Sequence, residues 1–177
     1  SSTSKKSLQY AVFGAILGLY EIALSKGEIG MTKGEIAKNN FMQGYNCAQA
    51  VLLAFCDDLG FDEQTALMLA SPFGGGIGRM REVCGAFTGA VMVLGLKFGN
   101  TIGSDRAAKG KDYERVQLFA KRFKEELGSD TIICRELLGL SGPSDPDPAK
   151  RTKEYYQKRP CPETVAIASG LLGEFME

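Results

Sequence analysis

The sequence predicts an all-α fold, a single-domain helical bundle with a central apolar helix that contains glycine. Three observations support this class. Apolar residues recur at helical spacing in successive segments, capping residues and glycines separate those segments, and no segment alternates apolar and polar residues as a strand does. At 177 residues the chain has the length expected of one domain with one core.

The first element is a helix over 8–25, which we expect to form an N-terminal extension, residues 1–30, ahead of the main domain, residues 31–177. Gly27 and Gly30 end its pattern, and a new start follows at Met31.

This first segment has the outline of a secretion signal, because two lysines precede an apolar run over 10–20. Glu21 and the short apolar length favour an ordinary helix instead. We therefore expect a cytoplasmic protein. No segment reaches the roughly 20 apolar residues of a membrane span, so the protein is not expected to be membrane-embedded.

Asn46 is a good N-cap for a helix over 47–59, and Asp62 for a short helix over 62–70. The glycine-rich stretch 71–78 then reads as a loop. Its backbone N–H groups could bind an anion, but the stretch matches no nucleotide-binding motif, which favours a structural turn.

A helix over 79–98 is predicted next, and since it is apolar on all sides it should lie at the centre of the bundle. Small residues recur on it at spacings of four, which allows another backbone to approach closely; they are Gly85, Ala86, Gly89 and Ala90.

The last third of the chain is also predicted to be helical. Apolar spacing indicates an amphipathic helix over 113–127, stopped by Gly128. Shorter helices are expected over 130–138 and 150–157, on either side of a proline-rich loop. A terminal helix is expected from Pro162 to residue 175, with Pro162 at its first position.

Composition excludes several function classes. The chain has 21 basic and 21 acidic residues, so its net charge does not indicate a nucleic-acid partner. It has no histidine, which rules out Ser-His-Asp and Cys-His catalysis and any histidine-ligated metal or haem. The five cysteines are therefore the softest and most nucleophilic groups it has.

Three cysteines are predicted at helix N-termini: Cys47 after its cap, Cys134 in the first turn after Asp130, and Cys161 as an N-cap itself. Free backbone N–H groups and the helix dipole favour a thiolate there.

Cys84 should lie one turn into the central helix, on the same face as Arg81 and near Arg79, and these cations would also favour its thiolate. Cys56 differs, since it lies on an apolar stripe beside two aspartates that raise its pKa, and we interpret it as a core residue. The competing interpretation is that all five cysteines are buried packing residues.

The segments Gly44–Ala50, Cys84–Gly89 and Cys134–Gly139, followed by Cys161, resemble the C_GCAxxG_C_C family of redox-active proteins. The resemblance covers about residues 31–175. It implies that Cys47, Cys84, Cys134 and Cys161 are the family's four cysteines, with Gly85 and Gly89 in the second motif.

The resemblance also implies a cofactor, because a related domain in split-Soret cytochromes is associated with an iron–sulfur cluster. The haem of those cytochromes is not expected here, since no Cys-x-x-Cys-His motif is present.

Three hypotheses follow. In the first, Cys47, Cys84, Cys134 and Cys161 bind a [2Fe–2S] cluster, in preference to zinc, for electron transfer or sensing with a redox partner.

In the second hypothesis the protein is a metal-free thiol–disulfide oxidoreductase, with Cys84 or Cys161 as the attacking thiol. In the third it is a non-catalytic helical interaction domain, for example a transporter accessory. The sequence leaves open both the choice among them and whether copies of the chain associate.

Overall fold

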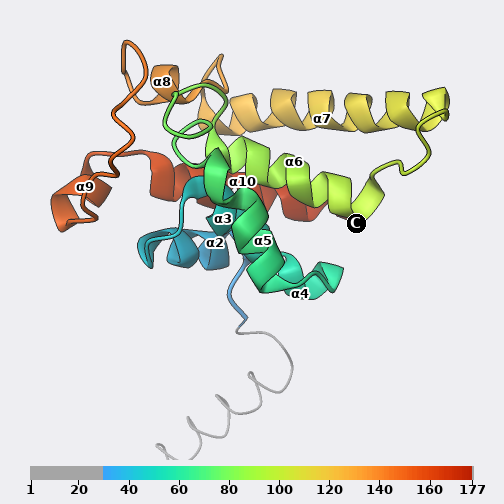
Figure 1. The fold of residues 1–177 in the computed structure, drawn as a ribbon, viewed down its shortest axis with the longest axis horizontal. Coiled ribbons are helices and arrows are strands. Elements are labelled where there is room, and N and C mark those ends of the chain that lie inside the picture. Colours follow the sequence, from blue (N-terminus) through green and yellow to red (C-terminus); the bar gives the residue numbers. More distant parts are fainter. Residues whose placement is uncertain (1–29, 177) are drawn as a thin grey trace, which may run out of the picture. The chain divides into compact units, whose positions relative to one another are not determined.

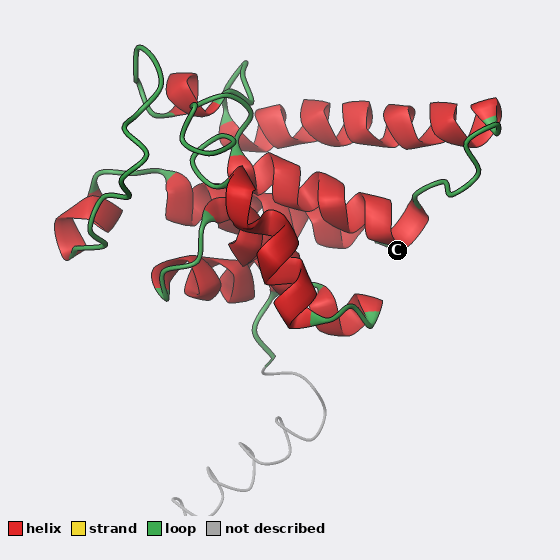
Figure 2. Cartoon of the chain, viewed as in Figure 1, coloured by secondary structure: helices red, strands yellow, loops and turns green. Residues whose placement is uncertain are grey.

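The computed structural model describes residues 30–176. The described residues form nine α-helices and one short 3-10 helix and contain no strand, which confirms the all-α class (Figure 2). The helix expected over 8–25 lies outside them. The elements are α2 (Lys33–Met42), α3 (Cys47–Leu53), α4 (Cys56–Leu59), α5 (Glu63–Ala70), η1 (Ser71–Phe73), α6 (Gly85–Phe98), α7 (Arg106–Leu127), α8 (Cys134–Leu137), α9 (Lys153–Gln157) and α10 (Cys161–Phe175).

Helix α6 is the apolar central helix that the sequence predicts, and it packs against α3, α7 and α10 (Figure 1). Its four small residues Gly85, Ala86, Gly89 and Ala90 are all buried. A Cβ atom at Gly89 would lie 2.7 Å from the carbonyl oxygen of Ala48 on α3. Small side chains therefore let the backbones of α3 and α6 approach each other more closely than larger residues would allow.

Aromatic rings fill the space between α6, α7 and α10. The Phe87 ring on α6 lies 5.8 Å from that of Phe119 and 5.9 Å from that of Phe123, both fully buried on α7. Phe175 of α10 meets Phe119 edge to face at 5.3 Å. Burying rings of this size stabilises such a core by about 2–3 kcal/mol each.

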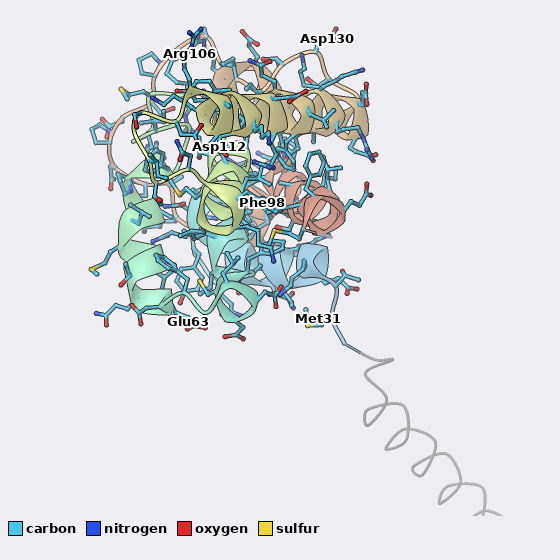
Figure 3. All side chains as sticks on the ribbon, turned by 90° about the vertical axis from the view of Figure 1, so that its right-hand side faces the viewer. Met31, Glu63, Phe98, Arg106, Asp112 and Asp130 are labelled. Carbon is cyan, nitrogen blue, oxygen red and sulfur yellow. The ribbon has the colours of Figure 1, made fainter. Side chains whose placement is uncertain are left out.

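The turn between α6 and α7 faces the viewer in Figure 3, where Phe98 and Asp112 are labelled. The guanidinium of Arg115 lies 4.4 Å from the centre of the Phe98 ring, and its Nη1 lies 3.3 Å from Oδ1 of Asp112. The contact with Phe98 holds α7 against the end of α6, while the ion pair with Asp112 lies within α7 and orients the Arg115 side chain.

The helix expected over 47–59 is interrupted, and the prediction of one helix is wrong there. Ala54 and Phe55 form a turn between α3 and α4. The Nζ of Lys33 donates to the Ala54 carbonyl oxygen at 2.8 Å and also pairs with Asp58 at 2.7 Å. A side chain from another helix therefore bonds a carbonyl at the end of α3, which a pattern of apolar residues does not reveal.

The helix expected over 79–98 begins only at Gly85. Ile77, Arg79 and Arg81 have φ values of 59°, 64° and 64°, which a right-handed helix does not contain. Val83 instead forms an isolated antiparallel bridge with Ile133.

Other boundaries shift for local reasons. Helix α7 starts earlier than residue 113, because Oδ1 of Asp105 accepts the N–H of Ala108 at 2.8 Å and caps it. Helix α8 begins at Cys134 with Ile133 as N-cap, so Asp130 is not its cap. Gly128 ends α7 in the left-handed region, as expected.

The short helix expected over 150–157 is α9, which starts at Lys153. Within residues 30–176, no helix has the length and apolar character needed to cross a membrane.

Candidate functional site

All four motif cysteines lie at the start of a helix. Cys47, Cys134 and Cys161 are the first residues of α3, α8 and α10, and Cys84 is the N-cap of α6. Two predicted positions are corrected: Cys84 is not one turn into its helix, and Cys161 is not an N-cap, since Pro160 occupies that position. The free N–H groups and the dipole of a helix N-terminus favour a thiolate at each place.

The start of α3 is built by a capping box that the sequence contains. The Asn46 side chain accepts the N–H of Gln49 at 3.0 Å, and the Gln49 side chain accepts the N–H of Asn46 at 3.1 Å. Asn46 also donates to the carbonyl of Ser71 at 2.9 Å. The capping box fixes where α3 begins and therefore where its first residue, Cys47, lies. The bond to Ser71 joins this end of α3 to the glycine-rich loop.

A backbone bridge brings two cysteines together that are far apart in the sequence. The N–H of Cys84 donates to the Ile132 carbonyl at 2.8 Å, and the N–H of Cys134 donates to the Glu82 carbonyl at 2.6 Å. The segments before α6 and α8 therefore run side by side, and both helices start at the same end of the bundle (Figure 1).

Glycines give the cysteines room. A Cβ atom at Gly76, where φ is +69°, would lie 2.6 Å from Cβ of Cys134, and one at Gly85 would lie 3.0 Å from Cβ of Cys47. The glycine-rich loop thus passes directly over a cysteine. It is a structural turn in the described chain, as expected, and it also forms one wall of the site.

The four cysteines line one cavity of about 290 Å³. Cys84 and Cys134 are buried in its wall, while Cys47 and Cys161 are partly exposed. The remaining wall includes the glycine-rich loop, the proline-rich loop and the side chains of Tyr155 and several arginines. Four separate segments are therefore brought to one place, and α3, α6, α8 and α10 each contribute one sulfur.

Cys47 and Cys161 form a hydrogen-bonded pair. The hydrogen bond from the Cys47 thiol favours a thiolate at Cys161, and together with Arg159 and Arg151 it lowers the pKa of Cys161 to about 7. The same hydrogen bond, followed by burial, raises the pKa of Cys47 well above its usual range. Of the two thiols, Cys161 therefore forms a thiolate more readily than Cys47 does.

The other two thiols are held neutral by burial. Burial raises the pKa of Cys84 to about 12, against the opposing effect of the N–H groups of Ala86 and Phe87 in the first turn of α6. Burial also raises the pKa of Cys134, and the guanidinium of Arg81 acts in the opposite direction. A helix N-terminus alone is thus too weak to ionise a thiol that has lost contact with water.

Arg81 contacts Cys134, whereas the sequence predicts that it lies beside Cys84. It lies in the loop before α6, and its Nη1 is 3.9 Å from Sγ of Cys134, not beside Cys84. Arg79 also lines the cavity, and its Nε donates to the carbonyl oxygen of Asp145. The prediction of a shared helix face with Cys84 is wrong because the residues before Cys84 are not helical.

Cys56 lies apart from the cavity. It is 1% exposed in the core and its thiol donates to the Leu52 carbonyl at 3.5 Å. Burial raises its pKa, with Glu63, Asp57 and Asp62 adding to the effect. Its interpretation as a core residue agrees with this position.

Sequence reasoning missed three side chains of the site, Arg151, Tyr155 and Arg159. The guanidinium groups of Arg151 and Arg159 lie 4.8 Å and 4.7 Å from the centre of the Tyr155 ring. Arg159 precedes Cys161 by two residues, and this spacing could have indicated from the sequence that a basic side chain lies near that cysteine. Arg151 gave no such signal, because it reaches the site only through the loop before α9.

The donor chemistry of the cavity matches soft metals, since four thiolates are the ligand set of zinc and of iron–sulfur clusters. Among the side chains of residues 30–176, no three of Cys, Asp, Glu or His are grouped closely enough to hold one metal ion. A cluster with two irons takes its thiolates in two pairs, so it does not require three sulfurs at one point.

A family model described as "Putative redox-active protein (C_GCAxxG_C_C)" matches residues 45–175, which include all four cavity cysteines. No curated protein and no solved structure matches the chain.

Proposed function

The chain belongs to the C_GCAxxG_C_C family, and from this premise we propose that it is a redox protein whose Cys47, Cys84, Cys134 and Cys161 bind a [2Fe–2S] cluster. One observation carries the proposal: four cysteines from four helix N-termini line the same cavity. Disulfide chemistry needs only two sulfurs and packing needs none, whereas a cluster needs four.

The protein's own groups favour such a ligand set. When bound, the cluster would supply a one-electron redox centre. The thiols of Cys84 and Cys134 are neutral in the metal-free protein because burial raises their pKa, so a metal must displace their protons. The helix N-termini and the arginines around the cavity stabilise the negative charge that this leaves on the sulfurs.

The proposal is tested by measuring iron and acid-labile sulfide in anaerobically purified protein, together with its visible spectrum. We expect both in the wild type, their loss in Cys84→Ser, and their retention in Cys56→Ser, the matched control outside the cavity. Far-UV circular dichroism shows whether Cys84→Ser still folds. Wild-type protein that stays free of iron after anaerobic reconstitution would overturn the proposal.

A second candidate function is thiol–disulfide exchange, favoured by the hydrogen-bonded pair of Cys47 and Cys161. The Cys161 thiolate attacks a substrate disulfide, forms a mixed disulfide and releases one substrate thiolate, which takes up a proton. Cys47 then loses its proton and attacks the Cys161 sulfur, so the protein disulfide forms and the second substrate thiol leaves. Two electrons pass from protein to substrate.

Within this candidate, Cys161 is the attacking thiol and Cys84 is not. The pKa of Cys161 is lowered by its hydrogen bond from Cys47 and by nearby arginines, whereas burial raises the pKa of Cys84, so Cys161 forms a thiolate more readily than Cys84 does. Oxidation of metal-free protein by a small disulfide, followed by peptide mapping, is expected to give a Cys47–Cys161 bridge that a reductant reverses. Bridges distributed at random among the five cysteines would count against this candidate.

A further inference from the structure

The charged side chains that line the cysteine cavity are all arginines. Arg79, Arg81, Arg151 and Arg159 line it, and no Asp or Glu does. In the described part of the chain none of the four forms an ion pair with a carboxylate. Arg81 is only 3% exposed and the other three are half-buried. Buried charge without a counter-charge is costly, so this arrangement points to an anion.

The contacts that these arginines do make are with neutral groups. Nε of Arg81 lies 2.8 Å from Oγ of Ser144, and Nη2 of Arg151 lies 3.3 Å from the Tyr45 carbonyl oxygen. Arg159 stacks on Tyr155. Neutral acceptors and ring faces orient a guanidinium, but they do not cancel its charge.

Two of the guanidinium groups lie against one aromatic ring. Those of Arg151 and Arg159 lie 4.8 Å and 4.7 Å from the centre of the Tyr155 ring. Tyr155, both arginines and Cys161 line the same cavity, and Arg159 precedes Cys161 by two residues. Positive charge is therefore concentrated in the part of the cavity where Cys161 begins α10.

The positive charge exceeds what the cysteines can balance in either redox proposal. A [2Fe–2S] cluster with four thiolates carries a net charge of about −2 in its oxidised form, which leaves two of the four guanidinium charges without a partner. In the metal-free protein the negative charge of the cluster is absent, so the excess is larger.

The acidic residues of the adjoining segments do not line the cavity. Asp145 and Asp147 lie on the proline-rich loop but do not line the cavity, and Glu82 is paired with Arg135 at 2.6 Å. Glu154 lines a neighbouring cavity of about 400 Å³, which shares Tyr155 and Arg159 with the first.

We propose that Arg151 and Arg159 form a binding site for a small oxyanion, the carboxylate or phosphate group of a small organic acid, beside Cys161. The planar guanidinium fork matches the oxygens of either group and can bind them in pairs. This inference rests on the arginines and on the absence of acidic lining residues, so it holds whether the cysteines bind a cluster or exchange disulfides.

Calorimetric titration of the full chain with two probes, inorganic phosphate and succinate, at constant ionic strength tests the site. We expect saturable binding of at least one probe and a loss of affinity of at least about tenfold in Arg159→Gln, because a charge-assisted contact is lost. The control is Arg106→Gln, an exposed arginine at the start of α7, which lies at the end of the bundle opposite to the start of α6 (Figure 1); it should leave affinity within about twofold of the wild type.

Saturable binding of phosphate or of succinate, weakened in Arg159→Gln but not in Arg106→Gln, supports the site and identifies which oxyanion it prefers. Two results would overturn it: no saturable binding of either probe by the wild type, or binding that Arg159→Gln leaves unchanged. Iron and sulfide measured on the same samples keep the two proposals separate, since anion binding without iron contradicts only the cluster.

Discussion

Nη1 of Arg81 lies 3.9 Å from Sγ of Cys134, although the two residues are 53 positions apart in the sequence. Both side chains are buried, and Arg81 lies in the loop before α6 with a φ of 64°. A non-glycine residue in the left-handed region costs about 1 kcal/mol or more. Such strain is typical of functional sites, and here it directs a cation at a thiol.

Replacing Arg81 should make Cys134 harder to ionise. The guanidinium favours the thiolate, so Arg81→Gln is expected to raise the pKa of Cys134 further, and Arg81→Lys to raise it less. Alkylation of metal-free protein across a range of pH, with Cys134 followed by mass spectrometry, measures the change. Arg135→Gln is the control, since Arg135 pairs with Glu82, and an equal shift there would contradict a specific role for Arg81.

Removing the hydrogen bond from Cys47 should raise the pKa of Cys161. The value of about 7 is lower than that of a free thiol, so the thiolate forms as pH rises through 7 and is lost below it. In Cys47→Ala the alkylation midpoint of Cys161 should move up by about 1–2 pH units, the equivalent of a hydrogen bond to a charged group. Cys47→Ser keeps an O–H donor and should shift it less; identical midpoints in all three proteins would contradict the pairing.

The close approach of α6 to α3 should make Gly89 intolerant of a side chain. A Cβ there would lie 2.7 Å from the Ala48 carbonyl oxygen, which belongs to backbone that cannot move cheaply. We expect Gly89→Ala to lower the free energy of unfolding by about 2 kcal/mol, measured by urea denaturation. At Gly95, on the same helix, a Cβ meets nothing within 4 Å, so Gly95→Ala should be neutral or stabilise by up to about 1 kcal/mol.

Alanine substitutions at Gly76 and Gly78 distinguish the cost of a strained backbone from the cost of a steric clash in the cavity wall. Both have positive φ, so alanine at either should cost about 1 kcal/mol. Only at Gly76 would the new Cβ also meet Cβ of Cys134, at 2.6 Å. Gly76→Ala is therefore expected to destabilise clearly more than Gly78→Ala in thermal unfolding and to speed alkylation of Cys134. Equal effects would mean that the contact with Cys134 is unimportant.

Local physics explains what could be predicted. Apolar spacing and capping residues act within a few residues of each other, so the helical class and the N-cap at Asn46 can be predicted from neighbouring positions. The same holds for Gly128, which ends α7 because a left-handed residue closes a helix locally. The separation of Cys56 from the other four cysteines also follows from its place on an apolar stripe.

Long-range contacts explain what could not. The break after α3 depends on Lys33, and the late start of α6 depends on a loop whose residues bond to the segment before α8. Those contacts join residues 21 or more positions apart, and a periodic pattern contains no information about them.

The sequence by itself determined that this is a helical protein with four motif cysteines and no histidine. Only the tertiary structure decided that those cysteines share one cavity, that Arg81 faces Cys134, and that Arg151 and Arg159 stand beside Cys161. The reason is that helix formation depends on hydrogen bonds between near neighbours, while a site depends on how distant segments pack.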